Sequence, residues 1–363
     1  MINFFDLKKQ SRSIKKELLK TIGNVITDAA FSAGPYVEKF EHMFAKFIGT
    51  KYAIGLNSGT SALHLAMILL HVGKEDEVIV PANTFIATAW AVSYVGAKPV
   101  FADCDPNTWE IDPNDVEKKI TAKTKAVIGV HLYGQPFDID AVKKITKRHK
   151  LLLVEDCAQA HGALYKNKKV GSFAEMGCFS FYPSKNLGAL GEAGEITTNK
   201  KSYMKELKIL RNQGSTKKYF HNQIGFNMRM EGIQGAVLSL KLKYLETWNK
   251  RRKTIARLYQ QQINNPKIKK QFQPKWAESV YHLFVVAVEN RPHFLHYLEV
   301  KGIGYSIHYP LPCHLQKAFK YLHYHQGDLP IAEKLANQCV SIPIYPEMTN
   351  DQIEKVIDVL NKY

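Results

Sequence analysis

Short apolar runs alternate with helix-like segments along the first two thirds of the chain. The runs read KYAIGL (51–56), DEVIVP (76–81), KPVFADC (98–104), KAVIGVHL (125–132) and LLLVEDC (151–157). Continuous Val, Ile and Leu, without strict alternation with polar residues, is typical of strands buried on both faces. Helical segments such as SALHLAMILL (61–70), TAWAVSYVG (88–96) and DIDAVKKITKRH (138–149) lie between them. The pattern predicts an α/β fold with a mostly parallel sheet covered by helices.

The apolar pattern changes after residue 230. The segment EGIQGAVLSLKLKYLETWNKRRKTIARLYQQQI (231–263) has apolar residues near helical spacing and few helix breakers, which predicts one long helix. The stretches YHLFVVAVEN (281–290), RPHFLHYLEVKG (291–302) and TNDQIEKVIDVLNKY (349–363) then indicate a small α+β unit. We therefore expect a large α/β domain over residues 1–245 and a smaller C-terminal domain over residues 246–363.

Composition narrows the class of protein. With 363 residues, 45% of them hydrophobic, the chain has the composition of an ordinary globular protein. No run approaches about 18 apolar residues, and the N-terminal stretch turns charged early, so we expect neither a membrane span nor a secretory signal. The five cysteines form no CxxC pair and are odd in number, which favours buried thiols over a disulfide framework. The expected location is cytoplasmic.

The formal charge of +17 raises the question of an anionic partner. Nucleic acid, an anionic membrane and a phosphorylated small substrate are the candidates for a basic protein. The basic residues are spread along the whole chain in short groups, with no long basic arm, no zinc-finger spacing and no RNP-type aromatic motif. A lysine-rich surface that serves solubility is therefore favoured, and we expect neither a nucleic-acid nor a membrane partner.

Two polar stretches fall at predicted strand ends, where ligands bind in open parallel sheets. NSGTSAL (57–63) opens a helix with Gly59 and Thr60, and free amides at a helix start suit a phosphate, although a plain N-cap fits as well. In VEDCAQAHG (154–162), Asp156 ends an apolar strand and needs a cation or strong donors, for example a protonated pyridine nitrogen, or else caps the next segment. No spacing supports a metal site at His131 or His161, so we expect no metal.

SFYPSKNLGALGEAG (180–194) places Lys185 among glycines just past a predicted strand. A lysine attacks carbonyls only when desolvation or neighbouring cations lower its pKa, and a lysine in a loop is usually a surface residue. In GFNMRMEGIQGA (225–236), Asn227 precedes the long helix, where an asparagine usually serves a turn. Together, a phosphate cradle, a strand-end Asp and this lysine meet three requirements of pyridoxal phosphate binding.

The motifs resemble those of the DegT/StrS-type sugar aminotransferases, a branch of the fold-type I pyridoxal phosphate enzymes. The resemblance covers nearly the whole chain and rests on these motifs in order: FFDLKKQ, GPYVEKFE, NSGTSALHLAM, VIVPANTFIATA, PVFADCDP, VEDCAQAHGA, SFYPSKNLGALGEAGEITTN, LRNQGS, GFNMRM and HYPLPCHLQKAF. It implies a fold with a mostly parallel, seven-stranded-type sheet.

The resemblance also implies roles for individual residues. Lys185 would bind the cofactor aldehyde as a Schiff base and shuttle a proton, and Asp156 would face the pyridinium nitrogen. The remaining implied cofactor contacts are Gln159 at the phenolic oxygen, Phe85 on the ring face, Gly59, Thr60 and Ser180 at the phosphate, and Asn227 from the partner subunit. The last of these contacts implies a homodimer with shared active sites.

The implied reaction moves an amine from L-glutamate to a nucleotide-linked keto-sugar. Family members that act on 4-keto sugars often carry His three residues before the lysine, where this chain has Tyr182. The run is more similar to the branch that aminates C3 of a dTDP-linked 3-keto-6-deoxyhexose for surface glycans such as O-antigen. His308 and Tyr309, in SIHYP, match that branch's substrate contacts. Ala193 departs from the usual Gly of the family, a small change that the site should tolerate.

Several alternatives stay open at this point. A neighbouring branch aminates UDP-linked 3-keto-hexuronates and shares the SKNLG run, and C4 amination is a further alternative. Arg211 and Lys217, in the loop RNQGSTKKYFHNQ, are candidates for binding the sugar diphosphate, or the loop is simply solvated. The rivals outside this activity are a basic regulatory or nucleic-acid-binding protein on the same fold, and a dehydratase. The dehydratases that lack the Schiff base carry His in place of the lysine, so Lys185 speaks against that reading.

Overall fold

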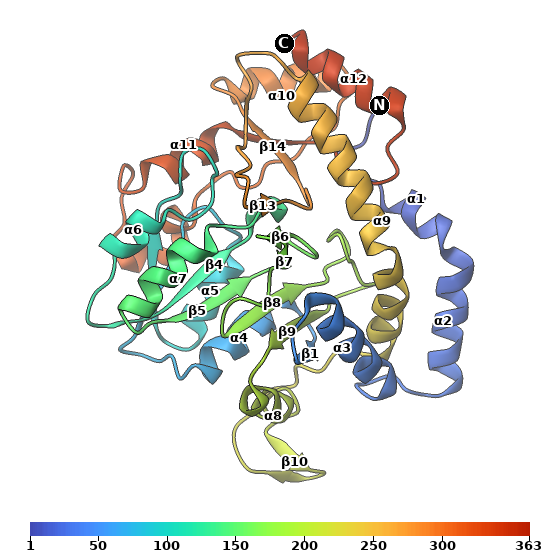
Figure 1. Ribbon diagram of the computed structural model, residues 1–363, viewed down its shortest axis with the longest axis vertical. Helices are drawn as coiled ribbons and strands as arrows, with labels where there is room; N and C mark the ends of the chain where they lie inside the picture. Colours follow the sequence, from blue (N-terminus) through green and yellow to red (C-terminus); the bar gives the residue numbers. More distant parts are fainter.

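A computed structural model describes all residues, 1–363, and its centre is a seven-stranded sheet (Figure 1). The strand order is β1-β9-β8-β5-β4-β2-β3. Only β9 runs antiparallel to its neighbours, so the predicted mostly parallel sheet is confirmed. The strands are β1 (Tyr52–Leu56), β2 (Glu77–Pro81), β3 (Lys98–Ala102), β4 (Thr124–Val130), β5 (Leu152–Asp156), β8 (Met176–Ser180) and β9 (Gly194–Thr198).

Helices cover both faces of this sheet. Alternate residues of one strand enter different cores: Val78 and Val80 pack into a cluster of 40 buried residues, and Ile79 packs into a second cluster of 32. The first cluster draws on α4 (Gly59–Leu69), α5 (Ala87–Tyr94) and α8 (Lys201–Leu210), and the second on α3 (Pro35–Ile48), α6 (Pro113–Lys118) and α7 (Ile139–Arg148). Because both faces are buried, the strands are continuous apolar runs and not alternating ones.

The long helix α9 (Gly232–Gln262) links the sheet to the C-terminal part of the chain, as predicted from the sequence (Figure 1). Its first half packs through Leu238 and Leu245 into the second cluster, whereas Ile255 and Tyr259 belong to a separate cluster of 22 buried residues. That third cluster also contains Ile2 from the N-terminus. The proposed division at residue 245 falls inside α9 and stays a prediction.

The C-terminal part contains a small antiparallel sheet. Its strands, in the order β12-β14-β15, are β12 (Lys269–Lys270), β14 (Phe284–Ala287) and β15 (Cys339–Ile342). The helices around it are α10 (Arg291–Val300), α11 (Pro330–Gln338) and α12 (Asn350–Asn361), and Thr349 with Gln352 forms a capping box at the start of α12. The segments that the sequence predicts to be α+β thus form this small sheet and the helices around it.

The remaining elements lie at the edges of the two sheets. The N-terminal helices α1 (Leu7–Ser13) and α2 (Lys15–Thr27) lie on the side of the molecule that also carries α9 (Figure 1). A hairpin of β10 (Ser215–Lys217) and β11 (Phe220–His221) projects beyond α8. The last short strands, β6 (Leu164–Tyr165), β7 (Lys168–Lys169) and β13 (Ala277–Glu278), form a third small sheet. All five cysteines are buried free thiols, as expected, and none of the helices has the length and apolar character needed to span a bilayer.

Candidate functional site

A pocket of about 540 Å³, here called the Lys185 pocket, lies where the parallel strands end. The turn after β1 leads into α4, β5 ends at Asp156 and β8 ends at Ser180, so three chain segments meet at the edge where α/β sheets bind ligands. The pocket brings together most of the residues expected from the sequence: Gly59, Thr60, Phe85, Asp156, Gln159, Ser180, Tyr182, Lys185, His308 and Tyr309.

Lys185 sits in a tight loop that directly follows β8. Its amide donates a hydrogen bond of 2.8 Å to the carbonyl of Tyr182, which closes a turn at the mouth of the pocket. Burial lowers the pKa of Lys185 to about 8, and the nearby Asp156 carboxylate opposes that shift. At mildly alkaline pH, a substantial fraction of the molecules therefore has Lys185 as a free amine, which is what a nucleophilic lysine requires.

Helix α9 fastens the loop that carries Lys185. The buried Lys241 donates from Nζ to the carbonyl of Gly188 at 2.6 Å. At Gly188 itself, a Cβ atom would lie 2.2 Å from the carbonyl oxygen of Pro183, so the loop closes on itself only with glycine at that position. The loop that carries Lys185 is consequently closely packed and tied to α9.

Asp156 is 5% exposed at the end of β5 and accepts two hydrogen bonds. Its Oδ2 accepts from Thr88 Oγ1 at 2.8 Å, and its Oδ1 accepts from the amide of Ala158 at 3.1 Å. Burial raises the pKa of Asp156, while the two hydrogen bonds and the charge of Lys185 act in the opposite direction. A buried carboxylate that still lines an open pocket is suited to a cationic ligand group.

The start of α4 lines the same pocket as Lys185 and has the features of an anion site. Ser58 is the N-cap, and its Oγ accepts from the amide of Ser61 at 3.0 Å. Gly59 and Thr60 form the first turn, where free amides and the helix dipole favour a phosphate. A Cβ at Gly59 would lie 2.6 Å from the Cβ of Ser180, so glycine lets the helix start come close to the end of β8.

Aromatic and amide groups form the remaining walls. The ring of Phe85 is 51% exposed and lies 5.8 Å from the ring of Tyr309, centroid to centroid. Gln159 donates from Nε2 to the hydroxyl of Tyr309 at 3.1 Å and accepts at Oε1 from the amide of Tyr133 at 2.7 Å. These contacts hold Tyr309, which follows α10, against the residues of the large sheet.

Arg211 is not where the sequence led us to expect it. The side chain is largely buried at the end of α8, pairs with Glu41 and donates to the carbonyl of Gly55 at 2.6 Å. It does not line the Lys185 pocket. A guanidinium committed to a buried carboxylate is part of the core, so the pocket gives no support to the assignment of Arg211 to the sugar diphosphate, which stays a prediction.

Lys217 and Asn227 also lie outside the pocket of their own chain. Lys217 is exposed on β10 of the projecting hairpin, and Asn227 is exposed on the segment that leads into α9. Asn227 was expected to act on the partner subunit's cofactor, and the single chain leaves that expectation as a prediction.

Sequence reasoning missed part of the site, including three residues with polar or charged side chains. Thr88 holds Asp156 from α5, and Glu192 and His282 line the pocket. Nothing in the amino-acid sequence around Glu192 and His282 distinguishes them from ordinary residues of loops and strand edges. That Asp156 has a donor could have been anticipated, because a buried strand-end carboxylate needs one. That the donor comes from α5 could not, because α5 follows β2, which is separated from β5 by β4 in the sheet.

The two histidines weighed as metal ligands, His131 and His161, are buried outside the pocket lining. His131 stacks on Phe137 with ring centroids 4.7 Å apart, and its Nε2 lies 3.1 Å from Glu155. The Glu155 oxygens already accept from the amides of residues 171, 173 and 174, which leaves them little capacity for a metal ion. His161 packs between two phenylalanines of the β8 segment, and burial lowers its pKa to about 3.

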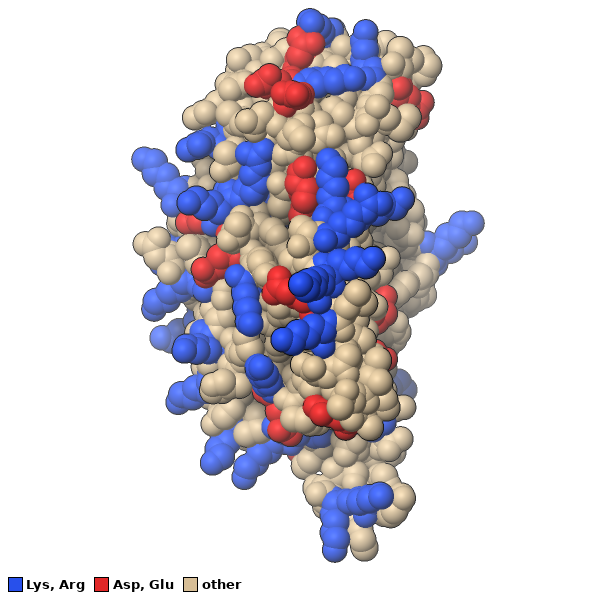
Figure 2. All heavy atoms as spheres, turned by 90° about the vertical axis from the view of Figure 1, so that its right-hand side faces the viewer, with Lys and Arg blue, Asp and Glu red and all other residues tan.

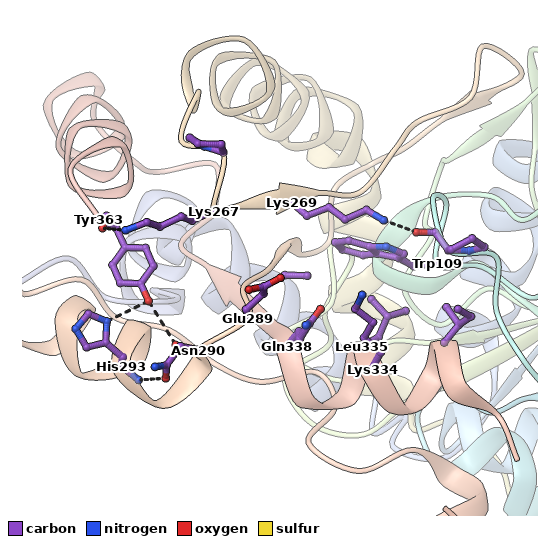
Figure 3. A pocket seen from close by; sticks show the side chains of 14 residues that line it. Trp109, Lys267, Lys269, Glu289, Asn290, His293, Lys334, Leu335, Gln338 and Tyr363 are labelled. Carbon is purple, nitrogen blue, oxygen red and sulfur yellow. Dashed lines mark hydrogen bonds between the residues drawn. The ribbon is translucent and has the colours of Figure 1, made fainter. Parts of the chain in front are cut away.

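A larger cavity, of about 750 Å³, lies at the small sheet and shares no lining residue with the Lys185 pocket (Figure 3). Lys267, Lys269 and Lys334 line it, and all three are exposed. Lys269 donates to the carbonyl of Pro106 at 2.7 Å, and Lys267 donates to that of Tyr363 at 3.3 Å. None of these lysines is desolvated as Lys185 is, so this cavity does not offer a second nucleophilic amine.

The basic charge of the protein does not form a single stripe on the face that carries α1, α2 and α9. Figure 2 shows Lys and Arg scattered over this whole face, with Asp and Glu among them. This distribution resembles a solvated surface more than the clustered footprint of a nucleic-acid-binding protein.

Comparison with known proteins places the chain among sugar aminotransferases. The profile of the DegT/DnrJ/EryC1/StrS aminotransferase family matches residues 12–361. A dTDP-3-amino-3,6-dideoxy-alpha-D-galactopyranose transaminase of Aneurinibacillus thermoaerophilus is 44% identical, with 100% of this chain and 99% of the relative covered. A UDP-N-acetyl-3-dehydro-alpha-D-glucosamine 3-aminotransferase of Acidithiobacillus ferrooxidans is 38% identical over 99% of this chain and 97% of the relative. The crystal structure of DesV from S. venezuelae superposes with a TM-score of 0.98 at 40% identity, covering 99% and 98% of the two chains.

Proposed function

The chain belongs to the DegT/DnrJ/EryC1/StrS aminotransferase family, and on that basis we propose that it transfers the amino group of L-glutamate to C3 of a dTDP-linked 3-keto-6-deoxyhexose. The coarser activity, that of a pyridoxal phosphate-dependent sugar aminotransferase, follows from the family and from its solved neighbours. The finer proposal is carried by Tyr182 at the pocket mouth, in the position where 4-keto relatives often have His. The 44% identical relative, named as a dTDP-3-amino-sugar transaminase, supports it.

The residues of the Lys185 pocket fit pyridoxal phosphate. Lys185 supplies a desolvated amine, Asp156 supplies a buried carboxylate for the pyridinium nitrogen, and Gly59 at the start of α4 supplies amides for the phosphate. Phe85 and Gln159 line the same pocket, where Phe85 would cover the ring and Gln159 would contact the phenolic oxygen. When bound, the cofactor supplies the electron sink that makes a proton beside the nitrogen labile.

Lys185 would accept and donate that proton at its Nζ atom. With a pKa of about 8, Nζ can take a proton as the free amine and return it as the ammonium within one turnover. Asp156 would hold its negative charge against the pyridinium nitrogen, because hydrogen bonds from Thr88 and Ala158 favour the ionised carboxylate. The two groups thus divide proton transfer and charge stabilisation between them.

The sugar would bind at the pocket mouth between three side chains. Tyr182 is 49% exposed there, and His308 and Tyr309 approach from the C-terminal part of the chain. His308 is held by a hydrogen bond of 2.7 Å between its Nδ1 and the hydroxyl of Ser341. The competing substrates are a 4-keto sugar and a UDP-linked 3-keto-hexuronate, and the product would enter the synthesis of a surface glycan.

A homodimer with shared active sites is part of the proposal. The hairpin of β10 and β11 and the residues after it expose large apolar side chains: Tyr219 at 82%, Phe220 at 61% and Ile224 at 90%. Apolar groups on a projecting hairpin are typical of a contact with another chain. In such a dimer, Lys217 would approach the sugar diphosphate and Asn227 the phosphate in the partner's pocket.

One assay tests the proposed reaction against its alternatives. Purified enzyme and L-glutamate are incubated in parallel with a dTDP-linked 3-keto-6-deoxyhexose, the 4-keto isomer and a UDP-linked 3-keto-hexuronate, and amino-sugar formation is followed by mass spectrometry. We expect product from the dTDP-linked 3-keto sugar alone. Preferred turnover of either other substrate would reassign the carbon or the nucleotide.

The net charge of +17 is the one observation behind a second candidate, a basic regulatory protein that binds nucleic acid, and the scattered basic residues speak against it. Titration with duplex DNA at two salt concentrations tests it, because phosphate contacts make affinity fall steeply with salt. We expect no specific binding at physiological salt.

A further inference from the structure

His282 lines the Lys185 pocket and is held in place from behind. It is 8% exposed, just before β14. Arg252 of α9 donates to the carbonyls of Tyr281 and His282, each at 3.2 Å. The imidazole Nδ1 lies 3.1 Å from Oδ1 of Asn186, the residue next to Lys185. The backbone and one edge of the imidazole are therefore fixed, and only the other edge is free.

The hydrogen-bond network fixes which ring nitrogen carries the proton. Asn186 donates from Nδ2 to the carbonyl of Val280 at 3.2 Å and to Oδ1 of Asn249 at 2.9 Å. Asn249 in turn donates from its own Nδ2 to the carbonyl of His161 at 2.8 Å. Backbone carbonyls only accept, so both amide orientations are set. Oδ1 of Asn186 is then an acceptor, and Nδ1 of His282 must donate to it.

The Nε2 atom of His282 is consequently a lone-pair acceptor. It has no hydrogen-bond partner in the protein and is not enclosed by protein atoms. Burial, followed by the charges of Lys185 and Arg252, lowers the pKa of His282 well below its usual range, which keeps the ring neutral. A neutral imidazole fixed in this way accepts a hydrogen bond from a hydroxyl but offers nothing to a carbonyl oxygen.

We propose that His282 is a specificity residue whose Nε2 accepts a hydrogen bond from a sugar hydroxyl on a carbon beside the keto group. This inference rests on the proposed function, because the hydroxyl belongs to the keto-sugar. A site built to pair with a substrate hydroxyl discriminates against the analogue that lacks it. His282 would thereby select hydroxylated hexoses over their deoxy analogues.

Two substitutions test the roles of the two ring nitrogens separately. His282→Asn keeps a donor near Asn186 and removes the acceptor from the pocket, whereas His282→Gln places an amide oxygen near the Nε2 position and loses the bond to Asn186. The exposed His296, on α10, provides His296→Asn as the matched control. The sugar half-reaction is measured with the cofactor preloaded in its amino form, and the glutamate half-reaction is measured separately.

We expect His282→Asn to lower kcat/KM for the hydroxylated sugar by about 3- to 10-fold, the worth of one neutral hydrogen bond. The loss should vanish with either the 2-deoxy or the 4-deoxy analogue, which identifies the hydroxyl, and the glutamate half-reaction should lose less than the sugar half-reaction. His282→Gln should recover part of the loss. Equal losses on all sugars, or a loss confined to glutamate, would overturn the inference.

The tautomer offers a readout that does not depend on turnover. In histidine-labelled holoenzyme, the ¹⁵N resonances of His282, assigned by their disappearance in His282→Asn, should show a protonated Nδ1 and a bare Nε2. The reverse tautomer would contradict the inference even if the enzyme were active. If the wild type aminates no keto-sugar but shows the expected tautomer, the proposed function fails while the acceptor assignment stands.

Discussion

Thr88 is the residue through which we test the role of Asp156. Its Oγ1 donates to Asp156 Oδ2 at 2.8 Å, and Thr84 Oγ1 lies 2.9 Å behind it. Because Thr88 has one hydroxyl proton and gives it to Asp156, Thr84 must donate to Thr88. Thr88→Val keeps the shape of the side chain and removes the donor. The pKa of Asp156, already raised by burial, then rises further, since a hydrogen bond to the charged form has been lost.

The magnitude follows from the charge on the acceptor. A hydrogen bond to an ionised group contributes about 1.5 to 3 kcal/mol, which corresponds to about 10- to 100-fold in affinity for a ligand that needs the carboxylate charged. We therefore expect Thr88→Val to weaken pyridoxal phosphate binding by about that factor, more strongly as the pH falls, because protonation of Asp156 competes with binding. Thr88→Ser, which keeps the hydroxyl, should bind nearly as the wild type does.

The assay is an absorbance titration of apoenzyme with the cofactor at several pH values, with thermal denaturation as a check on folding. If Thr88→Val binds the cofactor as tightly as Thr88→Ser at every pH, the hydrogen bond to Asp156 does not tune the site and the reasoning fails.

Three further substitutions probe the site and its support. Lys185→Ala should abolish the visible absorbance of the bound cofactor, and an unchanged spectrum would refute its assignment. Gly188→Ala would place a Cβ 2.2 Å from the carbonyl oxygen of Pro183 and should weaken cofactor binding. The control Gly73→Ala, whose Cβ would have no heavy atom within 4 Å, should have no effect. If the two variants bind the cofactor equally well in absorbance titrations, the tight packing of the loop is not needed for binding. Arg211→Met should lower the free energy of unfolding, measured by urea denaturation, by about 3 kcal/mol or more, as expected for a broken buried ion pair. The KM for the sugar should not change. A raised KM with unchanged stability would instead assign Arg211 to the substrate site.

The sheet could be predicted from the sequence because each strand carries its own signal. A strand buried on both faces is a continuous apolar run, as at Val78, Ile79 and Val80, and those runs sit at the observed strands. Strand order and the antiparallel direction of β9 depend on long-range pairing, which no local pattern encodes. The predicted α/β fold was confirmed for this reason, while its topology came only from the structure.

The residues of the site also divide into those that a local pattern could predict and those that depend on long-range contacts. Lys185 and Asp156 could be found because a lysine among glycines and a carboxylate at a strand end are locally unusual. The buried ion pair of Arg211 could not be predicted because its partner Glu41 is 170 residues away in sequence, and a guanidinium in a predicted loop gives no sign of a buried carboxylate. His282 was missed for the same reason, since its role depends on Asn186, which is 96 residues away.

Burial moves the pKa values of Lys185 and Asp156 in opposite directions, and each charge opposes the shift of the other. Their titrations are therefore coupled, so a change at one group alters the other. Asp156→Asn removes the negative charge that raises the pKa of Lys185, so the amine becomes easier to deprotonate and a better nucleophile. A severe loss of transamination in Asp156→Asn cannot then be attributed to a lysine trapped as the ammonium. Such a loss, measured by single turnover across pH 7 to 9, would isolate the stabilisation of the pyridinium nitrogen, and near-normal turnover would show that the carboxylate is not needed there.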